Sequence, residues 1–311
     1  MIEPTSEPLV SAVIPAYLRP GPLGRCLDSL LAQTYRNLEI IVVDDAADDA
    51  TRDVVDARAR PGLKYLRHEI RSLTAQSMND GIRASRGDIL VVMGDDNILH
   101  SDAIAGFVRA FGRDPRIAFV GALVHYLDPP DRIHTAGARV TRFTRRLITL
   151  GENEIDRGQF RAPYDVEIVD GCIGMRRSVF ATTGMVDARR LPFYHETTSI
   201  QFRARQAGLR IVLDPSIRVW HDLPPTARQT RALVSPLRAY YMMRSRILLE
   251  RYYDEPSKTA TFAIALPFYA LSFLGQAVTV SASETARWAV LRALMAGLRD
   301  GLLDREGIRI L

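Results

Sequence analysis

Short apolar runs alternate with amphipathic segments over the first 125 residues, and this alternation constrains the fold most. Five runs predict strands, at residues 9–15, 38–43, 63–66, 88–93 and 117–124. The intervening segments predict helices: one opened by Pro22, one from about residue 50, one capped by Ser72 or Thr74 and ending near Ala84, and one from Ser101 to Phe111. Continuous apolar strands separated by helices predict a mainly parallel sheet with helices on both faces.

Polar residues follow three of these strands where each strand ends. The first strand leads into residues 15–19, the second into Asp44 and Asp45, and the fourth into residues 94–97, which read Gly-Asp-Asp-Asn. Ligands of an open α/β sheet bind beyond the carboxyl ends of its strands. We therefore expect these three segments to meet at one binding site.

Composition and missing motifs exclude several classes of function. The formal charge of +5 favours anionic partners, or has no specific cause in an Arg-rich chain. The chain lacks dinucleotide, P-loop and Ser-hydrolase motifs, and no nucleic-acid-binding pattern is present, so no nucleic acid partner is expected. Two distant cysteines, Cys26 and Cys172, indicate a reducing compartment and no zinc site, and the N-terminus does not resemble a signal peptide.

The C-terminal part differs in composition. A basic segment at 228–252 precedes residues 259–283, which carry no charge, and residues 284–307 predict an amphipathic helix with an apolar stripe. The uncharged segment is long enough to cross a bilayer, but a re-entrant, interfacial or buried hairpin is the alternative. The amphipathic helix either contacts a membrane or packs on its own domain.

The residues suggest metal and acid–base chemistry. Asp95 and Asp96 could bind a divalent cation together with a diphosphate, although a bare Asp pair more often lies in a surface turn. His221 closes an apolar run and could add a nitrogen ligand for Mn²⁺. Glu196 is a candidate general base, or else an acid favoured by a helix N-terminus.

Five motifs in order resemble one known family. They are VIPAYLRP, LAQTYRNLEIIVVDDAADDAT, AQSMNDGIRASRGDILVVMGDD, DGCIGMRRSVFATTGMVD and FRARQAGLRIVLDPSIRVWHD, which lie within residues 8–222. The chain resembles the family-2 glycosyltransferases of the GT-A fold, and looks most like the rhamnosyltransferase-type, cell-envelope members. The resemblance implies a nucleotide-diphospho-sugar transferase domain, here with a C-terminal helical, membrane-associating tail.

The resemblance also implies roles for individual residues. The implied donor-binding residues are Pro15, Tyr17, Arg19, Asp44, Asp45, Arg71, Asn79 and Asp95. The implied acceptor-binding residues are Gly171, Cys172 and His195. In this interpretation Asp44 accepts a hydrogen bond from a pyrimidine ring, Asp96 and His221 bind Mn²⁺ or Mg²⁺, and Glu196 is the catalytic base.

The sequence departs from the family pattern at two places. Gly94 stands where the D-x-D motif has its first acid, and Thr197 stands where the acidic acceptor motif usually supplies the base. A threonine hydroxyl is not a base near neutral pH. Glu196 is the carboxylate left in that motif. The alternatives are a base from elsewhere, such as Asp170 or His195, or a slow or inactive enzyme.

These observations lead to a set of expectations. Residues 1–125 form the nucleotide-sugar-binding half of a GT-A domain, 126–227 the acceptor-binding half, and 228–311 a helical membrane-associated segment. The expected function is metal-dependent inverting transfer from a UDP- or dTDP-sugar to a lipid-linked or cell-envelope glycan, at the cytoplasmic face of the inner membrane. The alternatives are transfer onto polyprenyl phosphate, and a catalytically weak nucleotide-sugar- or glycan-binding subunit of an envelope complex.

Overall fold

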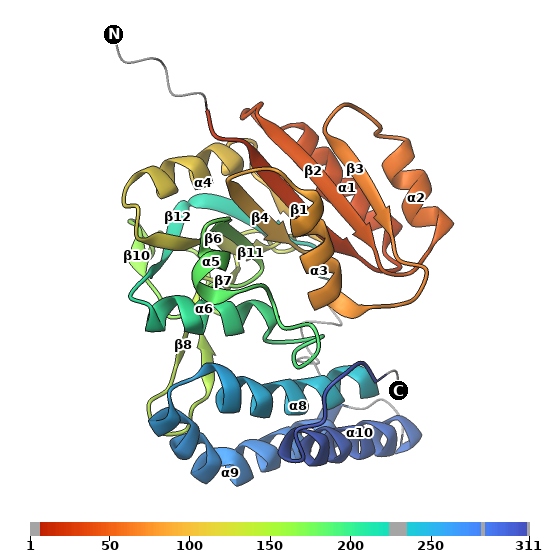
Figure 1. The fold of residues 1–311 in the computed structure, drawn as a ribbon, viewed down its shortest axis with the longest axis vertical. Coiled ribbons are helices and arrows are strands. Elements are labelled where there is room, and N and C mark those ends of the chain that lie inside the picture. Colours follow the sequence, from red (N-terminus) through yellow and green to blue (C-terminus); the bar gives the residue numbers. More distant parts are fainter. Residues whose placement is uncertain (1–6, 224–234, 281–283, 310–311) are drawn as a thin grey trace.

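A mostly parallel sheet forms the centre of the molecule (Figure 1). The computed structural model describes residues 7–223, 235–280 and 284–309. Within these residues the main sheet has the strand order β10-β12-β6-β11-β4-β1-β2-β3, with β5 paired to β12 and β7 paired to β6. The strands are β1 Val10–Ala16, β2 Leu38–Asp44, β3 Leu63–Arg67, β4 Ile89–Met93, β5 Asn97–Leu99, β6 Ile117–Tyr126, β7 Ile133–Thr135, β10 Tyr164–Asp165, β11 Cys172–Arg176 and β12 Arg210–His221.

Strand direction confirms the predicted α/β class. β1 pairs in parallel with β2 and β4, β2 with β3, and β6 with β12. β11 is antiparallel to both β4 and β6 and joins the two parallel groups. The predicted first and second halves of the domain therefore contribute strands to one continuous sheet.

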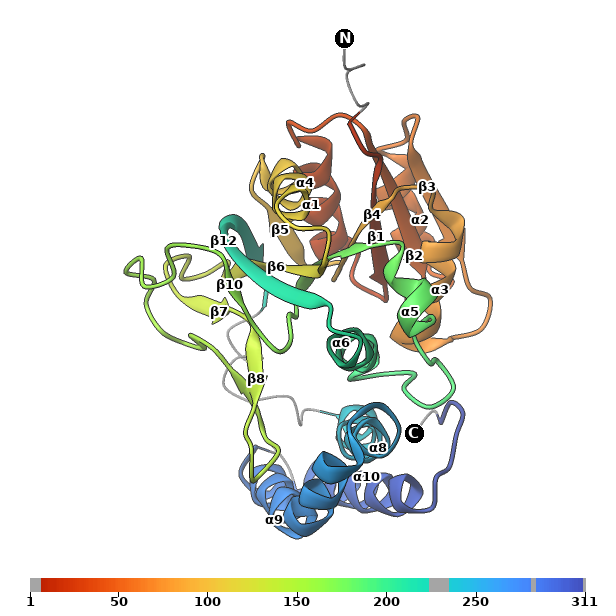
Figure 2. The same ribbon diagram turned by 60° about the vertical axis from the view of Figure 1, so that its left-hand side comes forward.

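Helices cover both faces of this sheet (Figures 1 and 2). They are α1 Pro20–Leu31, α2 Asp49–Asp56, α3 Leu73–Ala84, α4 Ala103–Gly112, α5 Val179–Thr183 and α6 Glu196–Gln206. One buried cluster joins α1, α2 and α4 to one face, and a second cluster joins α3, α5 and α6 to the other. Both faces of the strands are therefore buried, which explains their continuous apolar character.

The second half adds a hairpin and a long strand. Strands β8 (Ala138–Val140) and β9 (Leu147–Thr149) form the hairpin. Strand β12 runs from Arg210 to His221, with an irregularity between Asp214 and Arg218. Helix α4 begins at Ala103 after Asp102, so the expected cap by Ser101 is wrong.

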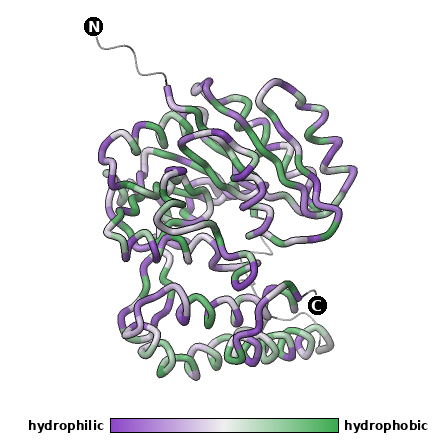
Figure 3. The backbone as a smooth tube through the Cα atoms, viewed as in Figure 1, coloured by the Kyte–Doolittle hydropathy of each residue, from purple (hydrophilic) through white to green (hydrophobic). Residues whose placement is uncertain are grey.

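Three C-terminal helices form a further layer below α6 (Figure 2). They are α8 Pro236–Tyr253, α9 Pro256–Val280 and α10 Glu284–Leu302. Buried residues of all three helices form one cluster that also includes Leu73. Figure 3 shows hydrophobic residues along the central strands and also along these outer helices. Among the described residues, α9 is the helix with the length and composition to cross a membrane, over Pro256–Gly275.

Helix α10 buries only part of the apolar stripe that the sequence suggested, since Leu291 and Leu298 of the stripe pack against the helical cluster. Val290 and Leu294 are buried, and Gly297 lets the backbone of Tyr240 approach so closely that an added Cβ would lie 2.3 Å from its carbonyl oxygen. Trp288 and Met295, which belong to the predicted stripe, are exposed. The helix therefore packs on α8 and still presents apolar side chains to its surroundings.

Candidate functional site

A cavity of about 450 Å³ lies beyond the carboxyl ends of β1 and β4, where the sequence predicted the site. We call it the donor cavity. Its wall includes these predicted site residues: Pro15, Tyr17, Arg19, Asp45, Arg71, Asp95, Gly171 and Glu196. Helices α3, α6 and α8 complete the wall, so the C-terminal layer closes a site that begins at the sheet.

Arg19 balances the two adjacent carboxylates after β4. Its guanidinium donates to Asp95, and its Nη1 lies 2.5 Å from Asp96 Oδ2. The backbone N–H of Tyr17 also donates to Asp95, at 3.3 Å. Burial raises the pKa of Asp95 to about 6, against the opposing charge of Arg19. The acid pair is thus held by residues that follow the neighbouring strand β1.

Asp96 also contacts His221, as the metal-site prediction requires. Strand β12 pairs with β5 so that His221 lies opposite Asn97, and His221 Nε2 is 3.1 Å from Asp96 Oδ2. Burial acts to raise the pKa of Asp96, but the hydrogen bonds and charges of His221 and Arg19 outweigh it and lower the pKa. Asp96 is therefore anionic at neutral pH. Neither Asp96 nor His221 is part of the donor-cavity wall, although the adjacent Asp95 is.

Gly94 has a steric reason to replace the usual acid. A Cβ at this position would lie 2.6 Å from Asp96 Oδ1 and 2.9 Å from Asn97 Nδ2. Real Cβ atoms essentially never approach so closely, so any side chain here would displace Asp96. The glycine at position 94, where the family pattern has an acid, therefore leaves the room that the side chain of Asp96 occupies.

Arg71 and Tyr17 form the outer rim of the donor cavity. The guanidinium carbon of Arg71 lies 3.9 Å from the centre of the Tyr17 ring. Asp45 fixes the segment that carries Arg71, because its carboxylate accepts from the backbone N–H groups of Ser72 and Leu73 at 2.7 and 2.8 Å. Ser72 thus precedes α3 as expected, but its hydroxyl does not cap the helix.

The structure does not bring two predicted donor-binding residues into the cavity wall. Asp44 is buried, and its carboxylate accepts from the backbone N–H groups of Ala46 and Asp48 and from the hydroxyl of Tyr65. Asn79 is buried in α3 and donates to the carbonyl oxygen of Val186. The sequence motif placed both residues near the site, but side-chain direction and local hydrogen bonds turn them into the protein.

Glu196 begins α6 and lines the donor cavity. Its Oε2 is buried and has no hydrogen-bond partner among the described residues. Burial, with a smaller contribution from the like charge of Asp170, raises the pKa of Glu196 to about 7. Asp170 also lines the cavity, and loss of solvent around its carboxyl group raises its pKa as well. A carboxyl group with a pKa near neutrality suits general-base chemistry.

Two consecutive residues before α6 have left-handed backbone conformations. Tyr194 has φ 64° and His195 has φ 62°. This conformation costs roughly 1–2 kcal/mol for each non-glycine residue. Burial and the charge of Arg246 lower the pKa of His195 to about 3, so His195 is neutral at physiological pH. His195 lies outside the donor cavity but lines the cavity next to it.

Of the two remaining residues predicted to bind the acceptor, one lines the donor cavity and the other does not. Gly171, with φ 81°, lines the donor cavity, and its left-handed backbone favours glycine. Cys172 is fully buried in β11, opposite Met93 of β4, so it lies in the sheet and not in the cavity wall.

Two further residues near the site, Phe193 and His134, were not among those predicted from the sequence. Phe193 lines the donor cavity, and the ring of His134 is 4.7 Å from that of His221. Neither belongs to a motif in the sequence.

Comparisons with known proteins agree with this geometry. Glycosyltransferase GlyG of Streptococcus pneumoniae is 33% identical over 98 residues, which are 31% of this chain and 33% of the relative. The chain spans about a third of the length of the first curated relatives that it matches.

Two solved structures share the fold. Mannosyltransferase PcManGT from Pyrobaculum calidifontis, in complex with GDP-Man and Mn²⁺, has a TM-score of 0.55 and 19% identity, over 97% of this chain and 89% of its own. GalNAc-T7 with UDP, GalNAc and Mn²⁺ has a TM-score of 0.58 and 16% identity, over 88% of this chain and 58% of its own.

A sequence profile described as "Glycosyl transferase family 2" matches residues 11–184, more than half of the chain. The match extends from β1 through α5 and includes Tyr17, Arg19, Asp95, Asp96 and Gly171. The fold, the strand-end acids and this match agree, and the chain belongs to glycosyl transferase family 2.

Proposed function

We propose that the protein is a metal-dependent inverting glycosyltransferase that moves a sugar from a UDP- or dTDP-sugar to a lipid-linked or cell-envelope glycan. One observation carries this proposal: a single cavity is lined both by Asp95, a member of the strand-end acid pair held by Arg19, and by Glu196, a carboxyl group with an unpartnered oxygen. One similar structure is described in complex with GDP-Man and Mn²⁺ and the other with UDP, GalNAc and Mn²⁺, which supports the same ligand class here.

The residues present fit a divalent cation. Asp96 and His221 would hold it, with Asp95 nearby, since carboxylate oxygen and imidazole nitrogen suit Mn²⁺ and carboxylates suit Mg²⁺. Among the described residues, no three His, Cys, Asp or Glu side chains are arranged as a metal cluster, so diphosphate oxygens are expected to complete the ligand set. When bound, such a cation stabilises charge on the departing diphosphate.

The chain's own residues account for the other parts of the transfer. Glu196 accepts the proton of the acceptor hydroxyl while that oxygen forms a bond to the anomeric carbon. The bond from the anomeric carbon to the diphosphate oxygen breaks, and the nucleoside diphosphate leaves. Arg19 lies on the donor side, where its positive charge can shift from the Asp95–Asp96 pair toward the diphosphate. Arg71 and Tyr17 hold the nucleotide at the rim.

The experiment measures release of nucleoside diphosphate from a panel of nucleotide sugars with Mn²⁺ or Mg²⁺. We expect turnover with a UDP- or dTDP-sugar and its loss in Asp96→Ala. The control is Asp56→Ala, because the Asp56 side chain is 64% exposed and lies on α2, outside the site. Turnover that survives Asp96→Ala would refute the metal assignment. Donor binding without turnover, when a suitable acceptor is supplied, would identify a binding subunit instead.

We also propose that the C-terminal layer attaches the protein to the cytoplasmic face of the inner membrane, peripherally or through one hydrophobic segment. Ile264 and Leu271 of α9 are 77% and 64% exposed, and Trp288 and Met295 of α10 are exposed too. Such side chains bind the boundary between lipid headgroups and acyl chains. We expect Ile264→Asp combined with Leu271→Asp to abolish co-sedimentation with anionic vesicles. Deletion of residues 256–311 is less informative, since it would uncover the buried side of α8.

A further inference from the structure

A second cavity lies between the β8–β9 hairpin, α8 and α9, away from the donor cavity. We call it the apolar cavity. It has a volume of about 470 Å³, and its wall includes Leu147, Met242, Ala265, Phe268 and Phe273. Phe268 lines it and is also 74% exposed, so the cavity opens at the outer surface of α9. Its opening is therefore on the side that carries the exposed apolar residues of this helix.

A third cavity, of about 430 Å³, adjoins both the apolar cavity and the donor cavity. We call it the bridging cavity. It shares Leu147, Tyr194 and His195 with the apolar cavity. With the donor cavity it shares Asp170, Glu196 and other residues that include Arg238. Three adjoining cavities therefore lie between the proposed base and the surface of α9, and their lining changes from polar beside Glu196 to apolar beside α9.

Arginines lie beside both parts of this path. Arg146 lines the apolar cavity near the hairpin, and Arg238 lines the bridging cavity. A phosphate group between a hydrocarbon chain and a sugar would meet these positive charges, since Arg pairs well with phosphate. The order of surfaces is thus apolar, cationic, and then the carboxyl groups of the reacting site.

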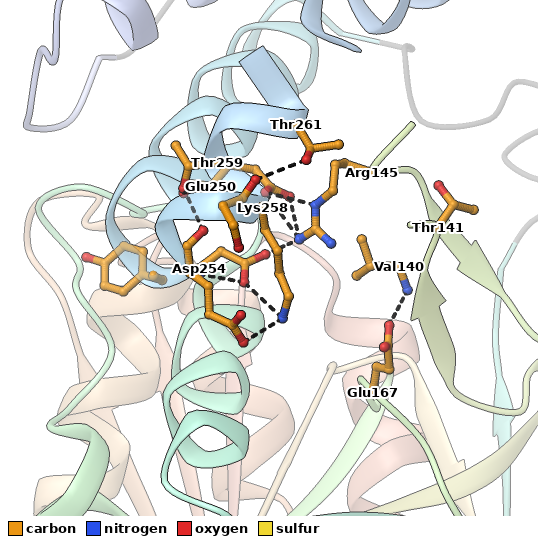
Figure 4. Close-up of polar contacts among 12 residues, drawn as sticks. Val140, Thr141, Arg145, Glu167, Glu250, Asp254, Lys258, Thr259 and Thr261 are labelled. Atoms are coloured by element: carbon orange, nitrogen blue, oxygen red, sulfur yellow. Dashed lines mark hydrogen bonds and ion pairs between the residues drawn. The ribbon is translucent and has the colours of Figure 1, made fainter. Parts of the chain in front are cut away.

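A buried ionic network holds the hairpin wall in place (Figure 4). Arg145, at the turn of the hairpin, has φ 54° and pairs with Glu250 and Asp254 at the end of α8. Arg246 also pairs with Glu250, at 2.5 Å, and donates to the carbonyl oxygen of Arg145. Because Arg145 is anchored to α8, its neighbours Arg146 and Leu147 are held against the apolar cavity beside α9.

We propose that the apolar cavity binds the hydrocarbon chain of the acceptor, which we infer to be a lipid with a phosphate-linked, hydroxyl-bearing head group. The chain enters at the exposed side of α9, the phosphate lies near Arg146, and the head group occupies the bridging cavity next to Glu196. This inference rests on the proposed function, because it selects a lipid-linked acceptor for the same site.

The test measures binding of farnesyl phosphate, below its micelle concentration, to the full-length protein by isothermal titration calorimetry. We expect it to bind at least about tenfold more tightly than inorganic phosphate, which corresponds to about 1.4 kcal/mol. Ala265→Trp fills the cavity and should weaken this binding at least tenfold, because Ala265 is 8% exposed and lines the wall. Phe268→Ser, at an exposed position, should weaken it without affecting folding.

Ile264→Trp is the matched control, because Ile264 precedes Ala265 on α9 but does not line the cavity. Its farnesyl phosphate affinity should equal that of the parent protein. Equal effects of Ile264→Trp and Ala265→Trp, or equal affinity for farnesyl phosphate and inorganic phosphate, would overturn the proposal. Binding of the donor nucleotide is measured on the same samples. If nucleotide binding is absent from the parent protein, the proposed function fails. If the nucleotide binds but farnesyl phosphate binds no more tightly than inorganic phosphate, only this inference fails.

Discussion

Replacement of Glu196 by glutamine separates its catalytic role from its cost to stability. Glu196→Gln keeps the size of the side chain but removes the proton acceptor, so we expect glycosyl transfer to fall by a factor of about 10² to 10⁴. In the parent protein, the rate should rise with pH and level off above about pH 7, where Glu196 is ionised. The variant should lose this pH dependence together with the activity.

The same substitution should stabilise the fold at high pH. The pKa of Glu196 is raised from 4.5 to about 7, so its ionised form is disfavoured in the folded state. A raised carboxyl pKa adds stability below the unfolded-state pKa, and that stability is lost as pH rises through the folded-state pKa. At about 1.4 kcal/mol per pKa unit, the cost is roughly 3 kcal/mol at pH 8 and about 1 kcal/mol at pH 5. Glutamine avoids this cost.

Urea unfolding of both proteins at pH 5 and pH 8 measures the effect. We expect the free energy of unfolding of Glu196→Gln to exceed that of the parent by an amount that grows by about 2.5 kcal/mol between the two pH values. Glu69→Gln is the control, because the Glu69 side chain is 82% exposed, and its difference from the parent should not change with pH. A difference for Glu196→Gln that is independent of pH would refute the raised pKa, and full activity would refute the base assignment.

Three further predictions concern other parts of the chain. Gly94→Ala should displace Asp96, destabilise the protein by about 1–3 kcal/mol and weaken Mn²⁺ binding measured by electron paramagnetic resonance, whereas Gly112→Ala, with no atom within 4 Å of its Cβ, should do neither. Arg71→Ala removes the contact with the Tyr17 ring and should raise the KM for the donor about threefold to tenfold with little change in kcat; an unchanged KM would contradict a rim role. Arg145→Met leaves Glu250 and Asp254 without that partner and should lower the free energy of unfolding by about 3–5 kcal/mol in urea titrations. The control Arg142→Met, on the exposed turn, should change it by less than about 0.5 kcal/mol. Similar values for both variants would contradict a stabilising network.

Local sequence patterns predicted the first half of the sheet well. The apolar runs became β1, β2, β3, β4 and β6 within two residues at each end, because strands buried on both faces need continuous apolar sequence. The acids that follow these strands also met at one edge, as parallel strands require. The pattern could not show that β11 lies between β4 and β6, because antiparallel insertion depends on contacts between residues distant in sequence.

Within the site, the motifs identified which segments converge but not which side chains face the ligand. Tyr17, Arg19 and Glu196 line the donor cavity, whereas Asn79 donates into the protein and Cys172 is buried in the sheet. Neighbouring residues of a strand point to opposite faces, and a helix turns only one side toward the cavity, so a position in a motif does not by itself decide access to it.

The sequence by itself determined the α/β class, the strand-end acids and the resemblance to a family, because these depend on local periodicity and on residue order. The tertiary structure decided which carboxyl group has a buried oxygen without a partner, and how the hairpin, α8 and α9 enclose an apolar cavity. These features arise from packing between segments that include residues more than a hundred positions apart, and burial in that packing, not residue type, sets the pKa of Glu196.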